Sequence, residues 1–465
     1  MNKQFSLTRA AILVVLIVLI LAPRPFAGSL DLKSAIRFES VGNAVEAEQS
    51  YGMAAARIPW MPSLWEKAGL AAMEAGDNEN AIVFFNEAIE RHAISYRGWL
   101  ALGIAYQKQG ENSLAVKAWL KAIPLAPATS YLAMAERSSG NYTEASQYWR
   151  AAIAQEPGNA AAYYSLGLIL MATSPEDALP ELMKAAELDQ DLDPTIQGLR
   201  TILNTGLMSN DPATHFLKAG EALAALSEWD LAEEAFHNAI TRRPNFAEAW
   251  AWLGEAKQQQ QKDGRLEIEK ALSYNSESAM VQGMYGTYLQ RQGKPDMALE
   301  AFIKAATLEP NNPAWQIALG SASEQSGDLI SAYGYYLLAV ELAPEDASTW
   351  RALATFCVKN NVDVDTSGMP AVLKLIGLAP NDWRSYDLAG QMEFLMEDYP
   401  AAENYLKKAV EMSPTQAAPA LHLGLVYMQT GDRTSAYSYF NLAKTFDSEG
   451  PYGWQAGRLL EQYFP

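Results

Sequence analysis

Residues 99–127 read WLALGIAYQKQGENSLAVKAWLKAIPLAP, and this stretch contains the full pattern that recurs along the chain. Its second half holds Ala115, followed seven residues later by Ala122, with Trp119 between them. The same alanine pair occurs ten times at a spacing close to 34 residues, starting at Ala47, Ala81, Ala115, Ala145, Ala178, Ala232, Ala298, Ala332, Ala402 and Ala436. A repeat of this length indicates a stacked array in which each unit buries its apolar face against its neighbours.

The first half of each unit carries a glycine twelve residues before the first alanine. This glycine is present in seven units, as Gly69, Gly103, Gly220, Gly286, Gly320, Gly390 and Gly424. Small residues at fixed places on two helices let the backbones approach, and the aromatic residue fills the gap beside them. A proline twelve residues after the first alanine, such as Pro127, cannot continue the second helix but suits the first turn of the next. The predicted unit is therefore helix, turn, helix, proline.

Trp99, Leu102, Gly103 and Tyr106 read W-x2-L-G-x2-Y, and with the alanine pair and Pro127 they resemble the tetratricopeptide repeat (TPR) family. The resemblance covers nearly everything after residue 28, in about twelve repeats. It implies an all-α fold, a right-handed α-α superhelical solenoid of about twelve TPR helix pairs. A hydrophobic helix is expected to precede the array. No convincing alternating strand pattern occurs in the sequence.

Departures from the period suggest how the array is divided. We expect a block of about five repeats over residues 28–192, an extra helical joint over 193–212, and about seven repeats over 213–450, with a capping helix over 451–465. A degenerate repeat inside one continuous superhelix is the alternative interpretation of residues 193–212. The unit 130–159 is four residues short, and the units 247–278 and 347–382 lack the alanine pair.

The N-terminus contains an uninterrupted apolar run, AAILVVLIVLILA, over residues 10–22. Thirteen helical residues reach about 20 Å, and a helix that starts at Phe5 reaches about 27 Å, close to the thickness of a bilayer core. Residues 1–27 are therefore interpreted as an uncleaved signal-anchor, or alternatively as a secretory signal peptide. The first interpretation tethers the repeats outside the cytoplasm with the N-terminus inside; the second makes the protein secreted or periplasmic.

Composition narrows the classes of partner. The formal net charge is −19, so the chain as a whole should repel nucleic acid and anionic lipid headgroups, whereas basic protein segments are compatible with it. Contact with a membrane is expected through the N-terminal helix only. The single cysteine, Cys357, excludes an intrachain disulfide and a thiolate metal site built from this chain alone.

No catalytic constellation is evident. The four histidines lie in different repeats, and none has another histidine at helical i+3 or i+4 spacing. Asp363, Asp365 and Gly368 match only the opening half of a calcium loop, because Lys374 stands where a glutamate is required. We therefore expect no enzyme activity, no cofactor, no metal and no small-molecule substrate.

The TPR resemblance implies a concave groove, lined by the first helix of each repeat, that binds extended peptides or partner helices. Projecting the motif onto the chain gives these partner-binding candidates: Glu221, Gln258, Gln290, Glu324, Gln325, Gln391, Phe394, Leu425, Met428 and Gln429. The amide and carboxylate groups suit hydrogen bonding to a peptide backbone, and the apolar members suit a partner helix. The alternative is that the apolar members pack against neighbouring helices or under the C-terminal cap.

These inferences predict a non-catalytic, membrane-tethered protein-protein interaction scaffold. Assembly of an envelope, secretion or surface-glycan complex is the setting that the resemblance implies. The alternative function is an accessory or regulatory subunit of a membrane enzyme such as a glycan polymerase or ligase.

Overall fold

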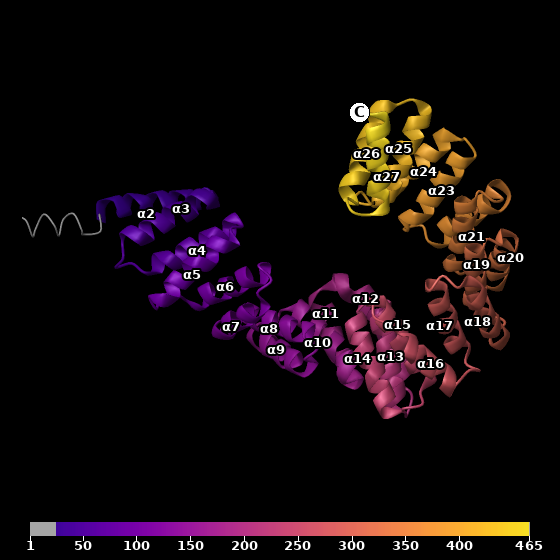
Figure 1. Cartoon of the computed structure of the whole chain (residues 1–465), viewed down its shortest axis with the longest axis horizontal. Coiled ribbons are helices and arrows are strands. Elements are labelled where there is room, and N and C mark those ends of the chain that lie inside the picture. Colours follow the sequence, from indigo (N-terminus) through magenta and orange to yellow (C-terminus); the bar gives the residue numbers. More distant parts are fainter. Residues whose placement is uncertain (1–24, 465) are drawn as a thin grey trace, which may run out of the picture. The chain divides into compact units, whose positions relative to one another are not determined.

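The computed structural model describes residues 25–464, and every regular element in that range is helical. It contains 26 α-helices, labelled α2 to α27, and forms an all-helical solenoid of TPR-like helix pairs, without any strand in the described range (Figure 1). The chain divides into two compact units, residues 1–244 and 245–465.

The first unit consists of five helix pairs, one additional helix and a sixth pair. Its helices are α2 (Pro25–Ser40), α3 (Ala44–Arg57), α4 (Ser63–Ala75), α5 (Asn78–Glu90), α6 (Tyr96–Lys108), α7 (Asn112–Lys121), α8 (Ala126–Ser138), α9 (Tyr142–Gln155), α10 (Ala160–Thr173), α11 (Ala178–Leu188), α12 (Asp193–Leu207), α13 (Pro212–Ala225) and α14 (Trp229–Arg242). Single 3-10 turns at Pro175–Asp177 and Gln190–Leu192 flank α11.

The second unit consists of six helix pairs and a final single helix. Its helices are α15 (Ala247–Gln259), α16 (Arg265–Tyr274), α17 (Ala279–Arg291), α18 (Pro295–Leu308), α19 (Pro313–Ser326), α20 (Leu329–Leu342), α21 (Ala347–Asn360), α22 (Met369–Leu378), α23 (Trp383–Leu395), α24 (Tyr399–Met412), α25 (Ala417–Thr430), α26 (Arg433–Phe446) and α27 (Pro451–Tyr463). A π turn at Val364–Gly368 precedes α22.

The predicted alanines and glycines lie where two helices meet. Every alanine of the ten pairs is at most 1% exposed. A Cβ atom added to Gly103 would lie 2.2 Å from Nε1 of Trp119, and one added to Gly220 would lie 2.4 Å from Cε1 of Phe236. Since real Cβ atoms do not approach other atoms this closely, the backbone of the first helix rests directly on the aromatic ring of the second helix at these two positions.

Polar side chains and glycines close the ends of many helices. Carboxylates such as Asp77, Asp328 and Asp432 accept a hydrogen bond from a backbone N–H in the first turn of a second helix. Gly76 and Gly327 end first helices in the left-handed conformation, with φ of 81° and 86°. Local sequence therefore fixes both the turn inside a repeat and the start of its second helix.

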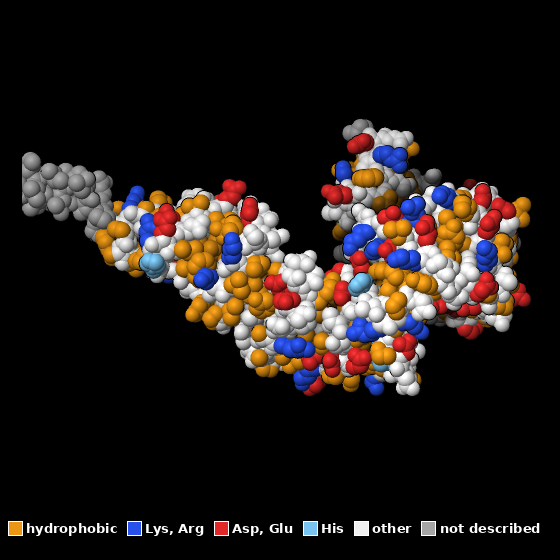
Figure 2. All heavy atoms as spheres, turned by 60° about the horizontal axis from the view of Figure 1, so that its bottom comes forward, with side chains coloured by type: hydrophobic (Ala, Val, Ile, Leu, Met, Phe, Trp, Pro, Cys, Tyr) orange, Lys and Arg blue, Asp and Glu red, His pale blue; other side chains and the backbone are white. Residues whose placement is uncertain are grey.

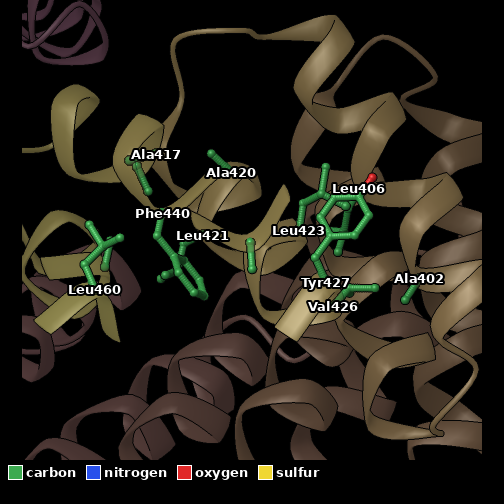
Figure 3. Close-up of a cluster of buried hydrophobic side chains, with 13 residues drawn as sticks. Ala402, Leu406, Ala417, Ala420, Leu421, Leu423, Val426, Tyr427, Phe440 and Leu460 are labelled. Carbon is green, nitrogen blue, oxygen red and sulfur yellow. The ribbon is translucent and has the colours of Figure 1, made fainter. Parts of the chain in front are cut away.

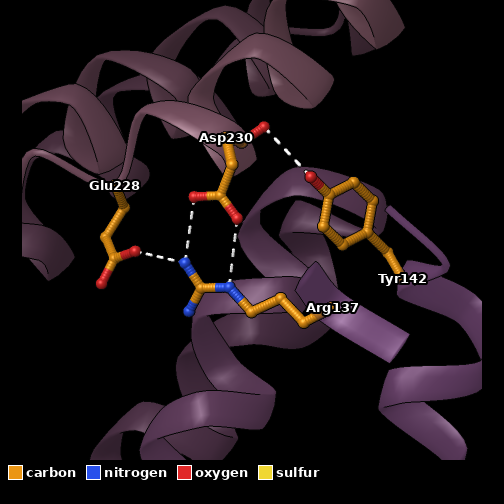
Figure 4. A network of polar contacts seen from close by, with 4 residues as sticks. All are labelled: Arg137, Tyr142, Glu228 and Asp230. Carbon is orange, nitrogen blue, oxygen red and sulfur yellow. Dashed lines mark hydrogen bonds and ion pairs between the residues drawn. The ribbon is translucent and has the colours of Figure 1, made fainter. Parts of the chain in front are cut away.

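The additional helix α12 changes how the last helices of the first unit pack. It packs between α11 and α13, while α10 contacts both α13 and α14. An ionic network joins α8 and α9 to the start of α14 (Figure 4): the Arg137 guanidinium donates to both carboxylate oxygens of Asp230, at 3.2 and 3.0 Å, and also to Glu228. The Tyr142 hydroxyl donates to the Asp230 carbonyl at 3.2 Å. The division of the array at residues 193–212 stays a prediction.

Irregular repeats absorb their length differences in links and turns. The first helix of the unit predicted at 130–159 is α8, which begins at Ala126, four residues before the expected start. The four-residue shortening therefore lies before α8 and not within the helix pair. The two extra residues of the unit 347–382 fall at the turn before α22, where Asn361 and Asp363 have φ of 52° and 42°. The aspartate pattern at residues 363–368 is thus part of a helix-connecting π turn.

No helix within residues 25–464 is long and apolar enough to cross a membrane. The predicted signal-anchor or signal peptide, with its apolar run at residues 10–22, lies outside the described residues.

The glycine contact gives a stability prediction. Gly220→Ala should destabilise the first unit by about 1–3 kcal/mol, because the new methyl group overlaps the Phe236 ring. The control is Gly198→Ala on α12, where no atom lies within 4 Å of the new Cβ and the substitution should stabilise by about 0.5–1 kcal/mol. Thermal and denaturant unfolding followed by circular dichroism measures both. Equal effects of the two substitutions would contradict the packing described.

Candidate functional site

All ten predicted groove residues lie on first helices, but only some of them come together. Glu221 is on α13 and Gln258 on α15; the others are Gln290 on α17, Glu324 and Gln325 on α19, Gln391 and Phe394 on α23, and Leu425, Met428 and Gln429 on α25. Gln391, Phe394 and Leu425 meet around one cavity in the second unit. The partner-binding role of the ten stays a prediction.

The cavity lies between the first helices of the C-terminal repeats and has a volume of about 260 Å³. Its lining comes from α21, α23, α25 and α27, with one residue of α24: Val358, Lys359, Gln391, Phe394, Leu395, Leu406, His422, Leu425 and Gln455. The walls are mostly apolar, with a few polar groups, as in sites that hold a ligand's apolar group while orienting its polar atoms.

The apolar candidates belong partly to the core. Phe394, Leu425 and Met428 are partly buried and pack against a cluster that includes Leu406, Leu421 and Phe440 (Figure 3). The Phe394 ring meets the Tyr399 ring edge-on, with centroids 5.7 Å apart. Leu395 is more accessible, at 38% exposure. Phe394 and Leu425 therefore contact the core and also line the cavity, and their role in binding a partner stays a prediction.

A buried carboxylate organises the polar side of the cavity. Asp387 is 6% exposed, and its two carboxylate oxygens contact Nδ1 of His422 at 2.7 Å and Nε2 of Gln391 at 2.9 Å. Because an ionised carboxylate only accepts hydrogen bonds, Nδ1 of His422 is assigned as the donor. This assignment leaves Nε2 of His422 for another partner. The contact fixes the imidazole ring at the cavity wall.

The Asp387–His422 pair is not apparent from residue spacing within a single helix. Asp387 is the fifth residue of the unit that begins at 383, and His422 is the sixth residue of the unit that begins at 417. The two residues occupy nearly equivalent positions on successive first helices. Comparison of such positions between repeats would have identified the pair, whereas spacing within one helix could not.

The same comparison reveals two more acid–base contacts between successive first helices. The Arg291 guanidinium on α17 pairs with both carboxylate oxygens of Glu255 on α15, at 2.6 and 2.7 Å, and Glu255 is only 7% exposed. Lys359 on α21 pairs with Glu324 on α19 at 2.8 Å. We call these two pairs, together with Asp387–His422, the first-helix ladder. Each joins neighbouring repeats across the predicted groove face.

Several predicted polar groove residues are engaged within the chain. Gln290 donates to the Ser321 hydroxyl at 2.8 Å, and Glu221 pairs with Lys218 at 2.7 Å. The side-chain nitrogen of Gln258 is buried without a hydrogen-bond partner in the described structure. Gln325 and Gln429 are exposed. Fewer of the predicted groove residues are therefore available for hydrogen bonding to a partner than the glutamine content of the sequence suggests.

The metal-binding potential of the described residues and the reactivity of the cysteine are the remaining chemical features of the chain. Within the described residues, no group of three or more His, Cys, Asp or Glu side chains is placed to hold a metal ion. Cys357 is fully buried, and burial together with the Asp363 charge raises the pKa of its thiol to about 11. Such a thiol is almost entirely protonated at neutral pH and is a poor nucleophile.

Glu324 gives a pH prediction. Burial alone would raise its pKa, but the hydrogen bonds and charge of Lys359 and the amide of Asn360 outweigh burial and hold the pKa below the usual value. When folding lowers the pKa of a carboxyl group, the ionised group stabilises the folded state at pH values above the pKa that the group has in the unfolded chain. This stabilisation is lost as the pH falls through the lower pKa of the folded state. Glu324→Gln should therefore cost about 1–2 kcal/mol at neutral pH, and the difference from the wild type should shrink under acid conditions.

Denaturant unfolding over a pH series measures this difference. The control is Glu411→Gln, since Glu411 is exposed and makes no ion pair in the described structure. A loss for Glu324→Gln that does not change with pH would show that the charge of Glu324 is not responsible.

Comparison with known proteins supports the repeat assignment. One model described as tetratricopeptide repeat matches three ranges, residues 66–129, 217–263 and 284–347, and a second such model matches residues 384–416. A model described as TPR repeat matches residues 134–174. Together these matches span just over half of the chain.

One curated protein and several solved structures are distantly similar to this chain. Mouse protein O-mannosyl-transferase TMTC1 is 27% identical over 135 residues, which span 28% of this chain and 14% of the relative. The APC/C hetero-tetramer Cut9-Hcn1 is similar at 15% identity over 96% of this chain and 99% of that one, with a TM-score of 0.47. Yeast Tom70 is similar at 16% identity over 94% and 95% of the two chains, with a TM-score of 0.43.

The TPR protein YrrB, whose structure is described as having an unusual peptide-binding site, is 18% identical and covers 41% of this chain and 98% of its own, with a TM-score of 0.33. The family matches fall in both compact units and cover helices of the repeats described above. The chain is therefore a tetratricopeptide repeat protein.

Proposed function

We propose that this chain is a non-catalytic scaffold that holds a segment of a partner protein against the first helices of its C-terminal repeats. The observation that carries the proposal is the cavity between α21, α23, α25 and α27. It lies on the helices that line the groove in the TPR family, and three of the ten predicted residues meet there.

The lining of the cavity suits an apolar side chain presented by a peptide. Phe394, Leu395 and Leu425 provide the apolar surface, and a volume of about 260 Å³ accommodates one large apolar side chain. Gln391, Gln455 and His422 stand at the same cavity with donor and acceptor groups. A peptide segment with an apolar anchor and a hydrogen-bonding backbone matches this combination.

Charge favours a basic partner. The net charge of −19 attracts basic segments over a distance and raises their association rate at low salt. Lys359 at the cavity is already paired with Glu324, so its charge is largely compensated. In this proposal, the apolar side chain of the partner provides most of the affinity, and the acidic surface of the chain favours basic partners over a longer distance.

The proposal includes a tether. The apolar run at residues 10–22 supports a signal-anchor that holds the repeats outside the cytoplasm, in the assembly of an envelope, secretion or surface-glycan complex. A second role, as an accessory subunit of a membrane enzyme, is compatible with the partial similarity to a protein O-mannosyl-transferase.

Site-specific crosslinking in cells tests the proposed binding site, with substitutions at two leucines of similar exposure as test and control. Leu395 lines the cavity at 38% exposure, whereas Leu442 on α26 has 41% exposure and lies outside the cavity lining. A photoreactive residue at position 391 should give a discrete protein adduct. Leu395→Glu should reduce the yield of that adduct at least tenfold, and Leu442→Glu should leave it unchanged.

Because both leucines are well exposed, neither substitution should change the circular dichroism spectrum. The proposal fails if the adduct survives Leu395→Glu, or if both substitutions remove it equally. Identification of the adduct distinguishes the two roles: a single stoichiometric integral-membrane enzyme would favour the accessory subunit, and several assembly proteins would favour the scaffold.

A further inference from the structure

The first three links between repeats differ in composition from most later ones. They are IPWMP (residues 58–62), RHAIS (91–95) and AIPL (122–125), and none contains an acidic residue. Most later links do contain one, as with Glu156, Glu277, Glu309, Glu345, Asp382 and Asp447. In a chain with a net charge of −19, three consecutive links without an acidic residue form a local exception.

These links also expose large apolar side chains. Trp60 is 58% exposed, Met61 39% and Ile123 37%, and Tyr96, the first residue after the second link, is 54% exposed. We call these four residues the link edge. Figure 2 shows hydrophobic side chains gathered over the part of the chain that holds α4 to α7. The link edge does not arise from a missing repeat at the end of the array, because every link has a helix pair on both sides.

Contacts place the first two links at one edge of the helix stack. A Cβ atom added to Gly28, near the start of α2, would lie 2.5 Å from Cγ1 of Ile58 in the first link. Glu66, near the start of α4, accepts a hydrogen bond from the backbone N–H of Ser95 in the second link at 2.8 Å. Because successive helices are antiparallel, the third link lies at the same edge of the stack as the first two. The connection from α3 to α4 therefore runs beside the start of α2 (Figure 1).

Cations accompany the exposed apolar side chains. Arg97, at the start of α6, and Lys121, at the end of α7, are exposed and make no ion pair among the described residues. Arg91 pairs with Glu87 and also lies over the Trp65 ring, 5.2 Å from its centroid. Tryptophan and tyrosine prefer the boundary between water and lipid, and exposed lysine and arginine favour anionic headgroups there.

The apolar run ends at Ala22, and α2 begins at Pro25. A run embedded in a bilayer therefore delivers the chain to the headgroup region at the edge where the first link lies. We propose that the link edge of the first three repeats rests in the interface of the bilayer, so that these repeats lie along the membrane surface. This proposal rests on the tether in the proposed function and assigns the membrane a second contact, beyond the N-terminal helix.

The test uses the full chain reconstituted into vesicles of phosphatidylcholine and phosphatidylglycerol. Cys357 is completely buried, so a nitroxide label reacts selectively at an introduced cysteine. Trp60→Cys and Tyr96→Cys report on the link edge. Glu111→Cys, at the turn between α6 and α7, and Asn311→Cys, in a later link, are exposed controls.

Labels at positions 60 and 96 should be several-fold less accessible to a water-soluble relaxation agent than labels at 111 and 311, and more accessible to oxygen. Equal aqueous accessibility at all four positions, in protein that floats with the vesicles and resists an alkaline wash, would overturn the link-edge contact but leave the tether intact. Protein that stays out of the vesicles would overturn both.

Discussion

The structure depends on one contact that is repeated along the chain: at the seven recurring glycines, the backbone of the first helix lies directly on a large side chain of the second helix. At Gly103 and Gly424, a Cβ atom would fall within 2.2 and 2.6 Å of Trp119 and Phe440. Glycine on one side and buried alanines on the other bring the two helices this close, and dense packing then fixes their relative orientation. The pattern repeats at the same spacing, and therefore the helix pairs stack regularly.

A stack of this kind puts equivalent positions of successive first helices beside one another. The first-helix ladder follows from that arrangement, because an acidic residue on one helix meets a basic residue or histidine on the next. Buried or half-buried ion pairs of this sort contribute little net free energy, but breaking one leaves a charge without its partner. The cavity opens among α21, α23, α25 and α27, where Phe394, Leu395 and Leu425 add apolar surface beside the ladder residues Lys359 and His422.

The all-helical repeats are predictable from the sequence because their determinants are local and occur many times. The alanine pairs and their glycines report directly on helix contacts, and each one is buried as expected. The placement of the ten candidate residues on first helices was equally predictable, because the repeat length determines which residues lie on the first helix of each unit. What the period could not predict is whether a polar side chain faces solvent or is already paired. Gln290 and Glu324 look available in the sequence, yet Ser321 and Lys359 engage them from neighbouring repeats. The Asp387–His422 contact was missed for the same reason, because it joins residues of different helices.

Hydrogen exchange on the full chain, alone and with its captured partner, tests the central claim most directly. If a partner segment lies against the first helices, binding should slow exchange in α23 and α25 and leave the exposed faces of α24 and α26 unchanged. Protection confined to the second helices, or absent from α23 and α25, would contradict the account.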